Sequence, residues 1–201
     1  MAAKSKAAIV AAARSAIGTA RKGTLANTPA IEVAKPIVAA AVERSGLDAT
    51  DFEDLILAES LQGGGDSARY IAVDLGFESI PGAAVNRQCA SSLAAIAFGA
   101  GQIASGMSRH ILAGGMESLS TMPQFLRRTA FTTGKEAGDW ERFAPMSNPI
   151  DCPDAPPFDM SITVAHNCAV EYGLTREDQD AWALRSHQRA VKAIDAGSFV
   201  D

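Results

Sequence analysis

Short apolar runs alternate with helical patterns through the first 118 residues. Apolar runs bounded by turn residues predict four buried strands, over Ala7–Ala13, Leu55–Glu59 and Gly82–Asn86 and from Ile111–Ala113 onward. Helical patterns fill the intervals, at about 29–45, 67–75 and 90–105. The resulting order, β-α-β-α-β-α-β, is typical of a parallel sheet with helices on both faces. The pattern therefore predicts an α/β fold.

Turn and cap residues indicate where the helices begin and end. Thr28 is the predicted N-cap of the first helix, Pro29 takes its first helical position, and Gly46 ends it. Pro36 predicts either a kink in that helix or its true start. The third helix, at 90–105, is rich in alanine and apolar on every side, so we expect all its faces to be buried.

The character of the sequence changes after residue 118. Residues 119–160 hold six prolines and few apolar runs, which predicts a long, mostly irregular segment of the kind that forms lids and interfaces. Two helices follow, at Ser161–Glu171 and from Thr175 to about Ala196, the second with a capping-box-like start. We therefore divide the chain into an α/β domain, 1–118, and a loop-and-helix part, 119–201.

Composition excludes several classes of protein. The 201 residues carry a formal net charge of −5, and 47% are hydrophobic and 20% charged, which excludes a disordered chain. The longest apolar-rich stretch, Leu93–Ile103, is shorter than the roughly 20 residues of a membrane span. Three cysteines cannot form an even disulfide framework. A negative charge without an aromatic-interleaved basic patch gives no case for nucleic-acid binding, so we expect a soluble cytoplasmic protein.

The N-terminal segment leaves a second location open. Residues 1–31 hold five basic residues and no acidic one, as in a mitochondrial transit peptide. The apolar run after two lysines also resembles a short signal peptide. The other interpretation is that Ala7–Ala13 is a buried first strand followed by a basic loop.

Cys89 is the leading candidate for chemistry. It follows the strand predicted at Gly82–Asn86 and precedes the helix at 90–105, so its thiol faces unpaired backbone N–H groups and the positive end of the helix dipole. Both favour the thiolate, which is the nucleophile, and the same N–H groups can stabilise an oxyanion on an attacked thioester carbonyl. From position alone, a buried cysteine that packs as a small hydrophobe is an equally good interpretation.

The other cysteines and the glycine-rich segment give weaker signals. Cys168 lies on the apolar face of a helix and is predicted to be core, whereas Cys152 lies in an acidic, proline-rich loop. The spacing of cysteines, histidines and acids there matches no established zinc pattern, so no metal site is predicted. The segment Gln62–Asp66 lacks the phosphate-loop and dinucleotide fingerprints and predicts a tight turn.

Four motifs stand in a recognisable order along the chain. They are Arg14-Ser15-Ala16-Ile17-Gly18, Val85-Asn86-Arg87-Gln88-Cys89-Ala90-Ser91-Ser92-Leu93, Ala113-Gly114-Gly115-Met116-Glu117-Ser118, and Thr175-Arg176-Glu177-Asp178 with Ser186-His187-Gln188-Arg189-Ala190. They resemble the opening strand and turn, the nucleophile segment, the Gly-Gly-Met-Glu-Ser motif and the lid helix of the thiolases. That family comprises acetyl-CoA acetyltransferases and 3-ketoacyl-CoA thiolases. The resemblance implies a thiolase-like, mostly parallel mixed sheet with helices on both faces, plus an incomplete lid subdomain.

The resemblance also implies an activity in fatty acid metabolism. Coenzyme A thioesters would be the substrates of a two-step acyl transfer, either thiolysis of a 3-ketoacyl-CoA in β-oxidation or condensation of two acetyl-CoA, without a cofactor. Cys89 would hold the acyl group, and its backbone N–H would supply part of an oxyanion hole. Met160 matches a family position that lines the acyl pocket. His187 lies where the family's lid approaches the coenzyme A nucleotide.

The family pattern is incomplete in this chain. Family members are about double its length, and their C-terminal half carries an Asn-Glu-Ala motif, a Gly-His-Pro histidine and a Cys-x-Gly-x-Gly cysteine that this sequence lacks. The last strand of the sheet and the rest of the lid also lie beyond Asp201 in the family. We therefore expect the chain alone to be inactive and to need a C-terminal half, in cis or as a separate chain, within a homodimer or tetramer. The alternative is a non-catalytic thiolase-like protein that binds acyl-CoA or a partner.

Overall fold

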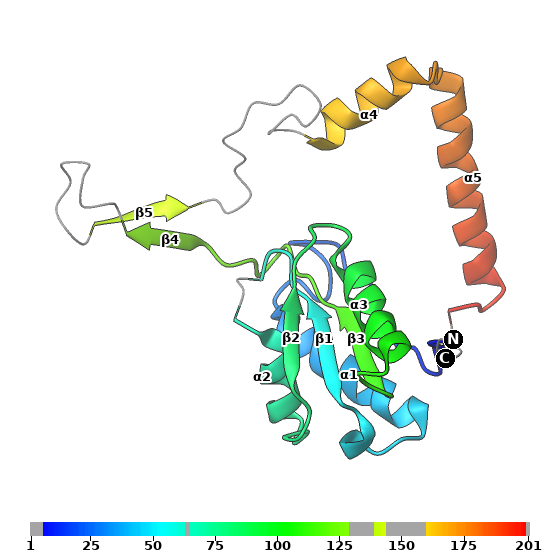
Figure 1. The fold of residues 1–201 in the computed structure, drawn as a ribbon. Coiled ribbons are helices and arrows are strands. Elements are labelled where there is room, and N and C mark those ends of the chain that lie inside the picture. Colours follow the sequence, from blue (N-terminus) through cyan, green and yellow to red (C-terminus); the bar gives the residue numbers. More distant parts are fainter. Residues whose placement is uncertain (1–5, 63–64, 129–138, 144–159, 200–201) are drawn as a thin grey trace. The chain divides into compact units, whose positions relative to one another are not determined.

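The computed structural model describes residues 6–62, 65–128, 139–143 and 160–199, with the backbone alone for 143 and 160–163. The chain divides into two compact units, Met1–Phe143 and Ala144–Asp201, and each is described by itself. The first unit contains α1 (Ala30–Ser45), the 3₁₀ helix η1 (Ala49–Asp51), β1 (Asp54–Ala58), α2 (Ser67–Asp74), β2 (Gly82–Val85), α3 (Ser91–Ser105), β3 (Ile111–Gly115), β4 (Phe125–Arg128) and β5 (Trp140–Phe143) (Figure 1). The second contains α4 (Met160–Glu171) and α5 (Arg176–Asp195).

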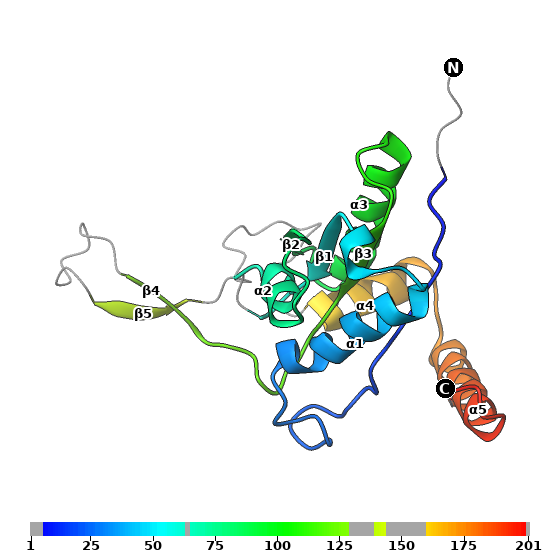
Figure 2. The same cartoon turned by 90° about the horizontal axis from the view of Figure 1, so that it is seen from below.

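Three parallel strands form the central sheet, in the order β2-β1-β3. β1 is the middle strand, with Leu55 opposite Gly82 of β2 and opposite Leu112 of β3. Helices α1 and α2 pack on one face and α3 on the other (Figure 1, Figure 2). The predicted α/β fold is therefore confirmed, and three of the four predicted strands form within one residue of their expected starts.

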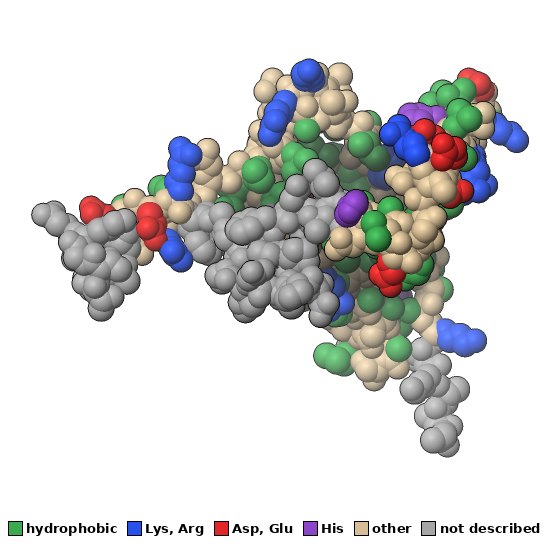
Figure 3. All heavy atoms as spheres, turned by 90° about the horizontal axis from the view of Figure 1, so that it is seen from above, with side chains coloured by type: hydrophobic (Ala, Val, Ile, Leu, Met, Phe, Trp, Pro, Cys, Tyr) green, Lys and Arg blue, Asp and Glu red, His purple; other side chains and the backbone are tan. Residues whose placement is uncertain are grey.

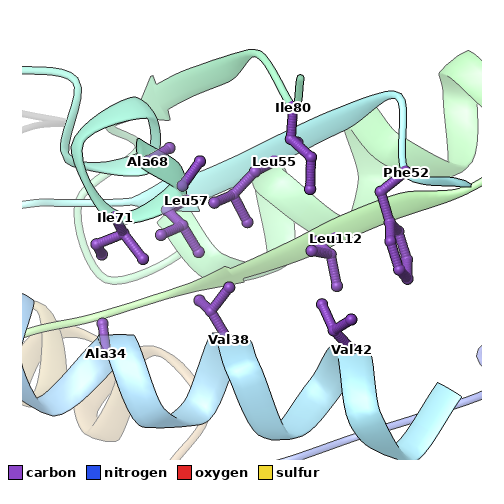
Figure 4. Close-up of a cluster of buried hydrophobic side chains, with 11 residues drawn as sticks. Ala34, Val38, Val42, Phe52, Leu55, Leu57, Ala68, Ile71, Ile80 and Leu112 are labelled. Atoms are coloured by element: carbon purple, nitrogen blue, oxygen red, sulfur yellow. The ribbon is translucent and has the colours of Figure 1, made fainter. Parts of the chain in front are cut away.

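The alternation of side chains along β1 explains why both faces are covered. Leu55 and Leu57 point to the face covered by α1 and α2, where they join Leu112 in a cluster of buried apolar side chains (Figure 4). Ile56 and Ala58 are also buried and lie on the opposite face, toward α3. The remaining members of the cluster come from helices and connections, namely Ala34, Val38, Val42, Phe52, Ala68, Ile71, Ala72 and Ile80.

The first helix differs from its prediction at the N-terminus. Pro29 occupies the N-cap position of α1, and its carbonyl accepts the first helical hydrogen bond, from the Val33 amide (3.1 Å). The prediction of Thr28 as the N-cap is therefore wrong by one residue. Pro36 lies inside α1 and is not its start. Gly46 ends the helix in the left-handed region (φ 70°), as predicted.

The strand predicted at Ala7–Ala13 does not form among the described residues, so this prediction is wrong. Ile9 and Val10 are 81% and 73% exposed, and the carbonyl of Ala12 accepts a hydrogen bond from Arg44 Nη1 (2.9 Å). A strand needs a hydrogen-bonded neighbour. Within the described part of the chain, the central sheet consists of β2, β1 and β3, and none of these strands pairs with Ala7–Ala13.

Helix α3 is buried on one face, not on all faces as predicted. Ala94, Ala95 and Gly99 are buried against the sheet, whereas Leu93 (73% exposed) and Phe98 (44% exposed) lie on the surface. Figure 3 shows apolar side chains, coloured green, at several places on the described surface. Uniform apolar composition indicates that a helix can be buried all round, but among the described residues the buried positions of α3 lie on its sheet-facing side.

Part of the segment predicted as irregular is an antiparallel hairpin. β4 pairs with β5, with Arg127 opposite Glu141 and Arg128 opposite Trp140. Arg127 Nε lies 2.9 Å from Glu141 Oε1, and the guanidinium of Arg128 lies over the Trp140 ring, 5.3 Å from its centroid. Cross-strand pairs of this kind stabilise two paired strands that the surrounding proline-rich segment, 119–160, conceals in the sequence.

The two helices of the second unit match their predictions closely. Thr175 caps α5: its hydroxyl accepts from the Asp178 amide (3.1 Å), and the Thr175 amide donates to Asp178 Oδ2 (3.0 Å). This reciprocal pair is the predicted capping box. Among the described residues, no helix combines the length and apolar character of a membrane span.

Candidate active site

The carboxyl ends of the three parallel strands meet at one edge of the sheet. β1 leads into Glu59 and Ser60, β2 leads into Asn86, and β3 leads into Met116 and Glu117. In open α/β sheets, ligand sites form outside this edge, because the loops there are free to vary while the strands hold them in place. The candidate site is built from these loops and from the start of α3.

Hydrogen bonds tie the loop after β1 to the loop after β2. Asn86 Nδ2 donates to the Ser60 carbonyl (3.0 Å), and Ser60 Oγ donates to the Gln88 carbonyl (3.0 Å). Asn86 Oδ1 also accepts from the Gln88 amide (2.9 Å). Gln88 adopts φ 50°, a left-handed conformation that non-glycine residues rarely occupy. Side-chain hydrogen bonds therefore hold a strained turn directly before Cys89.

Cys89 lies between that turn and α3, and it is exposed. The Ser91 hydroxyl accepts from the Arg87 amide (2.7 Å) and donates to the Gln88 carbonyl (2.5 Å). The Ser91 amide donates to the same carbonyl (3.0 Å). The interpretation of Cys89 as a buried packing residue does not fit this exposure. The thiol stands beside the N-terminus of a 15-residue helix, where backbone N–H groups can hydrogen-bond an anion.

Glu117 lies in the loop after β3, and its side chain holds the loop after β1 in place. Its carboxylate accepts from the Leu61 amide (3.2 Å), from the Ser118 amide (3.0 Å) and from the Gln62 side chain. This glutamate belongs to the Gly-Gly-Met-Glu-Ser motif, and the structure shows that it links two loops. The motif therefore shapes the edge of the sheet on which Cys89 lies.

Sequence reasoning missed Glu59 and Ser60. Glu59 is buried and accepts from the amide (3.2 Å) and the hydroxyl of Ser67, while its Oε1 has no hydrogen-bond partner in the described part of the chain. Ser60 contacts the turn before Cys89. The available signal was positional, because polar residues that directly follow a buried strand lie at the carboxyl edge of the sheet.

The two predicted substrate contacts belong to the second unit. Met160 is the first residue of α4, and its side chain lies outside the described residues. His187 lies on α5 and is exposed, beside a shallow groove that it lines with Gln188, Val191, Lys192, Asp195 and Ala196. Cys89 lies in the first unit, whereas Met160 and His187 lie in the second, so the structure shows no contact of either residue with Cys89.

The remaining candidates carry little chemistry. Cys168 is half-buried in α4, and Cys152 lies outside the described residues. In the described ranges, no group of three or more histidine, cysteine or acidic residues is arranged to hold a metal ion. The exposed thiol of Cys89 is therefore the nucleophile best placed for chemistry among the described residues.

Comparison with known proteins decides the family. The family model described as "Thiolase, N-terminal domain" matches residues 7–201. The chain belongs to the thiolase family. It is 37% identical over 195 residues to the acetyl-CoA acetyltransferase of Escherichia coli (strain K12), and 34% identical over 201 residues to the 3-ketoacyl-CoA thiolase of Bacillus subtilis (strain 168). The crystal structure of the Bacillus anthracis acetyl-CoA acetyltransferase matches its fold with a TM-score of 0.79 at 35% identity.

These thiolases extend well beyond the region that they share with this chain. The alignments cover 95% and 98% of this chain but 48% and 47% of the two curated relatives, and 48% of the solved structure. The chain therefore spans about half the length of the curated relatives it matches. The resemblance to the N-terminal half of a thiolase, inferred from the Cys89 segment and three further motifs, is confirmed.

Proposed function

We propose that this thiolase chain transfers acyl groups between a thioester on Cys89 and coenzyme A, with further catalytic groups supplied by a C-terminal thiolase half. One observation carries the proposal: an exposed thiol stands in a hydrogen-bonded turn directly before α3. It lies within the region shared with relatives named acetyl-CoA acetyltransferase and 3-ketoacyl-CoA thiolase. Acyl transfer to coenzyme A is the chemistry that those names share.

The proposed reaction proceeds in two steps. Cys89 Sγ bonds to C3 of a 3-ketoacyl-CoA, and the bond between C2 and C3 breaks. The electron pair leaves with C2, which takes a proton to complete acetyl-CoA, while the acyl group stays on sulfur. The thiol of a second coenzyme A then attacks the thioester, acyl-CoA leaves, and Cys89 regains a proton. The reverse sequence condenses two acetyl-CoA.

The Cys89 backbone N–H is one proposed donor of the oxyanion hole that stabilises the tetrahedral intermediates. Backbone donors that are fixed before the reaction stabilise developing negative charge without reorganising. Hydrogen bonds hold the turn before Cys89 in a defined conformation, which supports this role. No cofactor takes part, because the coenzyme A thioesters are substrates.

Residues 1–118 are the proposed α/β domain, and residues 119–201 are the proposed, incomplete lid subdomain. Met160 is the proposed acyl-pocket residue, and His187 the proposed contact to the coenzyme A nucleotide. The exposed position of His187 on α5 is compatible with binding a ligand. In the assembled enzyme, we expect Met160→Ala to alter the preference for acyl chain length and His187→Ala to raise the KM for coenzyme A.

The proposed partner is the C-terminal half, in cis or as a separate chain, within a homodimer or tetramer. Two surfaces support this proposal. Leu93 and Phe98 of α3 are exposed apolar side chains next to the candidate site. In the described part of the sheet, β3 has a neighbouring strand on one side only.

The proposed location of the protein is the cytoplasm. Fractionation of cells tests this location against the mitochondrial alternative.

Labelling of the 201-residue chain tests the nucleophile. Iodoacetamide and radiolabelled acetyl-CoA are applied in parallel, and the labelled peptide is mapped. We expect the label on Cys89, its loss in Cys89→Ala, and no change in the matched control Cys168→Ala. Label on Cys168 or Cys152 with Cys89 unmodified would overturn the assignment.

A thiolysis assay tests the need for a second half. We expect almost no turnover of a 3-ketoacyl-CoA by the 201 residues alone, and turnover once they are continuous or co-expressed with a thiolase C-terminal half. Turnover by the chain alone at the rate of full-length thiolases would contradict this expectation.

The half-length match also favours a second candidate, a non-catalytic protein that binds acyl-CoA or a partner. Native mass spectrometry and an acyl-CoA binding assay separate the two proposals. A monomer of 20.9 kDa that binds acyl-CoA but never labels Cys89 supports the second candidate. A co-purifying second chain supports the enzyme.

A further inference from the structure

The Gln88 carbonyl, directly before Cys89, accepts three hydrogen bonds. It accepts from the Ser91 amide (3.0 Å), from the Ser91 hydroxyl (2.5 Å) and from the Ser60 hydroxyl (3.0 Å). Ser91 is the first residue of α3, two positions after Cys89, whereas Ser60 comes from the loop after β1. Ser60 is therefore the one donor among these that connects the turn to the central strand of the sheet.

The geometry of a peptide unit gives this contact a consequence for Cys89. The Gln88 carbonyl and the Cys89 N–H belong to one planar trans peptide, so they point in opposite directions. A donor that holds the oxygen also fixes the direction of the N–H. Gln88 has φ 50°, in a sparsely populated region, so the turn depends on such contacts to keep its conformation.

We propose that Ser60 is a positioning residue for acyl transfer at Cys89: its hydroxyl holds the Gln88 carbonyl and thereby aims the Cys89 N–H at the oxyanion. This inference rests on the proposed function, which makes Cys89 the nucleophile. Asn86 fixes Ser60 in turn, because its side-chain amide donates to the Ser60 carbonyl (3.0 Å). The neighbouring Glu59 is buried, so the loop that carries Ser60 is anchored on its other side as well.

Two reactions of the same sulfur separate positioning of the N–H from reactivity of the thiol. Acylation by p-nitrophenyl acetate passes through a tetrahedral oxyanion and uses the N–H donor. Alkylation by iodoacetamide displaces iodide from a saturated carbon, where no oxyanion forms. The readout is the ratio of the acylation rate constant to the alkylation rate constant at Cys89, measured by peptide mapping on the 201-residue chain.

The variants Ser60→Thr and Ser60→Val have nearly the same shape and differ in the hydroxyl. The matched control is Ser105→Ala, which removes a hydroxyl that donates to the Gln102 carbonyl (2.9 Å) at the far end of α3. We expect Ser60→Val to lower the ratio about three- to tenfold, the effect of one neutral hydrogen bond. Ser60→Thr and Ser105→Ala keep the wild-type ratio.

Each other outcome has a distinct meaning. An unchanged ratio in Ser60→Val, whether the two rates stay constant or fall together, overturns the positioning role and leaves Cys89 as the proposed nucleophile. A wild-type Cys89 that is alkylated but never acylated overturns the proposed function and this inference with it. Circular dichroism checks folding, and Ser60→Ala replaces Ser60→Val in the same comparison if the valine variant unfolds.

Discussion

Gly115 at the end of β3 lies against Ser92 in the first turn of α3, so closely that a Cβ at Gly115 would overlap the Ser92 hydroxyl. The same Cβ would lie 2.6 Å from the Cβ of Ala58 in β1. The absence of a side chain at Gly115 therefore leaves room both for the start of α3 and for Ala58 of β1. Close packing against the helix that follows Cys89 therefore explains why the second position of the Gly-Gly-Met-Glu-Ser motif is a glycine.

We expect Gly115→Ala to lower the free energy of unfolding by about 1–3 kcal/mol, because overpacking forces side chains and backbone to shift. Urea unfolding measures this change. The matched control is Gly101→Ala in α3, where an added Cβ meets nothing within 4 Å and we expect a gain of up to about 1 kcal/mol in helix propensity. A Gly115→Ala variant as stable as the wild type contradicts the steric account.

Ser67→Ala removes a donor to a buried acid. The Glu59 carboxylate accepts from both the amide and the hydroxyl of Ser67, and one of its oxygens already has no partner in the described part. We expect the variant to lose about 1–3 kcal/mol in urea unfolding at pH 7, the cost of leaving a buried polar group underbonded. The double variant with Glu59→Gln, which removes the charge, tests the cause. If the acid is responsible, Ser67→Ala destabilises the Glu59→Gln variant less than it destabilises the wild type.

Stability below neutral pH depends in part on Glu53. The Arg109 amide donates to its carboxylate, and this contact lowers the pKa of Glu53 below its usual value. Because the folded state holds the proton less tightly than the unfolded state, the contribution is complete above the usual pKa of about 4.3 and is lost as the pH falls through the lowered value. We expect Glu53→Gln to show a smaller drop in Tm than the wild type between neutral and acidic pH. Glu43→Gln, an exposed position on α1, controls for the loss of one charge.

Thr175→Ala removes the cap of α5. The pKa of Asp178 is lowered by the Thr175 amide and hydroxyl, so the two residues stabilise each other at neutral pH. We expect hydrogen exchange of the first-turn amides to become about five- to thirtyfold faster, since an N-cap contributes about 1 kcal/mol or more. Thr175→Ser keeps a capping hydroxyl and serves as the control. Equal exchange in the alanine and serine variants contradicts the role of the cap.

The sequence predicts local features of this fold better than features that depend on a distant neighbour. Gly46, Thr175 and the apolar run of β1 act within a few residues, and their predictions hold. The segment Ala7–Ala13 has the composition of a strand, but composition does not supply the strand beside it. The apolar surface of α3 misled prediction for the same reason, because burial depends on what covers Leu93 and not on Leu93 alone.

The residues of the candidate site show the same difference between local features and features that depend on a distant neighbour. Cys89 was identifiable because its segment and its position before a helix are both visible in the sequence. Ser60 was not, because its contact spans 28 positions and exists only once β1 and β2 are paired. Glu117 lay within a motif, but its hydrogen bonds to Leu61 and Gln62 depend on the pairing of β1 with β3. Motifs therefore indicated which residues matter, and topology determined how they are held.

The central place of β1 also bears on how the chain folds during synthesis. Both neighbours of β1 follow it in the sequence, so β1 emerges from the ribosome before either parallel partner has been translated. α1 precedes β1 and can cover the Leu55 and Leu57 face of the strand early, whereas the hydrogen-bonding edges of β1 stay open until β2 and β3 leave the ribosome. We expect stalled nascent chains that end before Ile111 to be cleaved within β1 by protease, and chains that carry β3 clear of the exit tunnel to resist cleavage there.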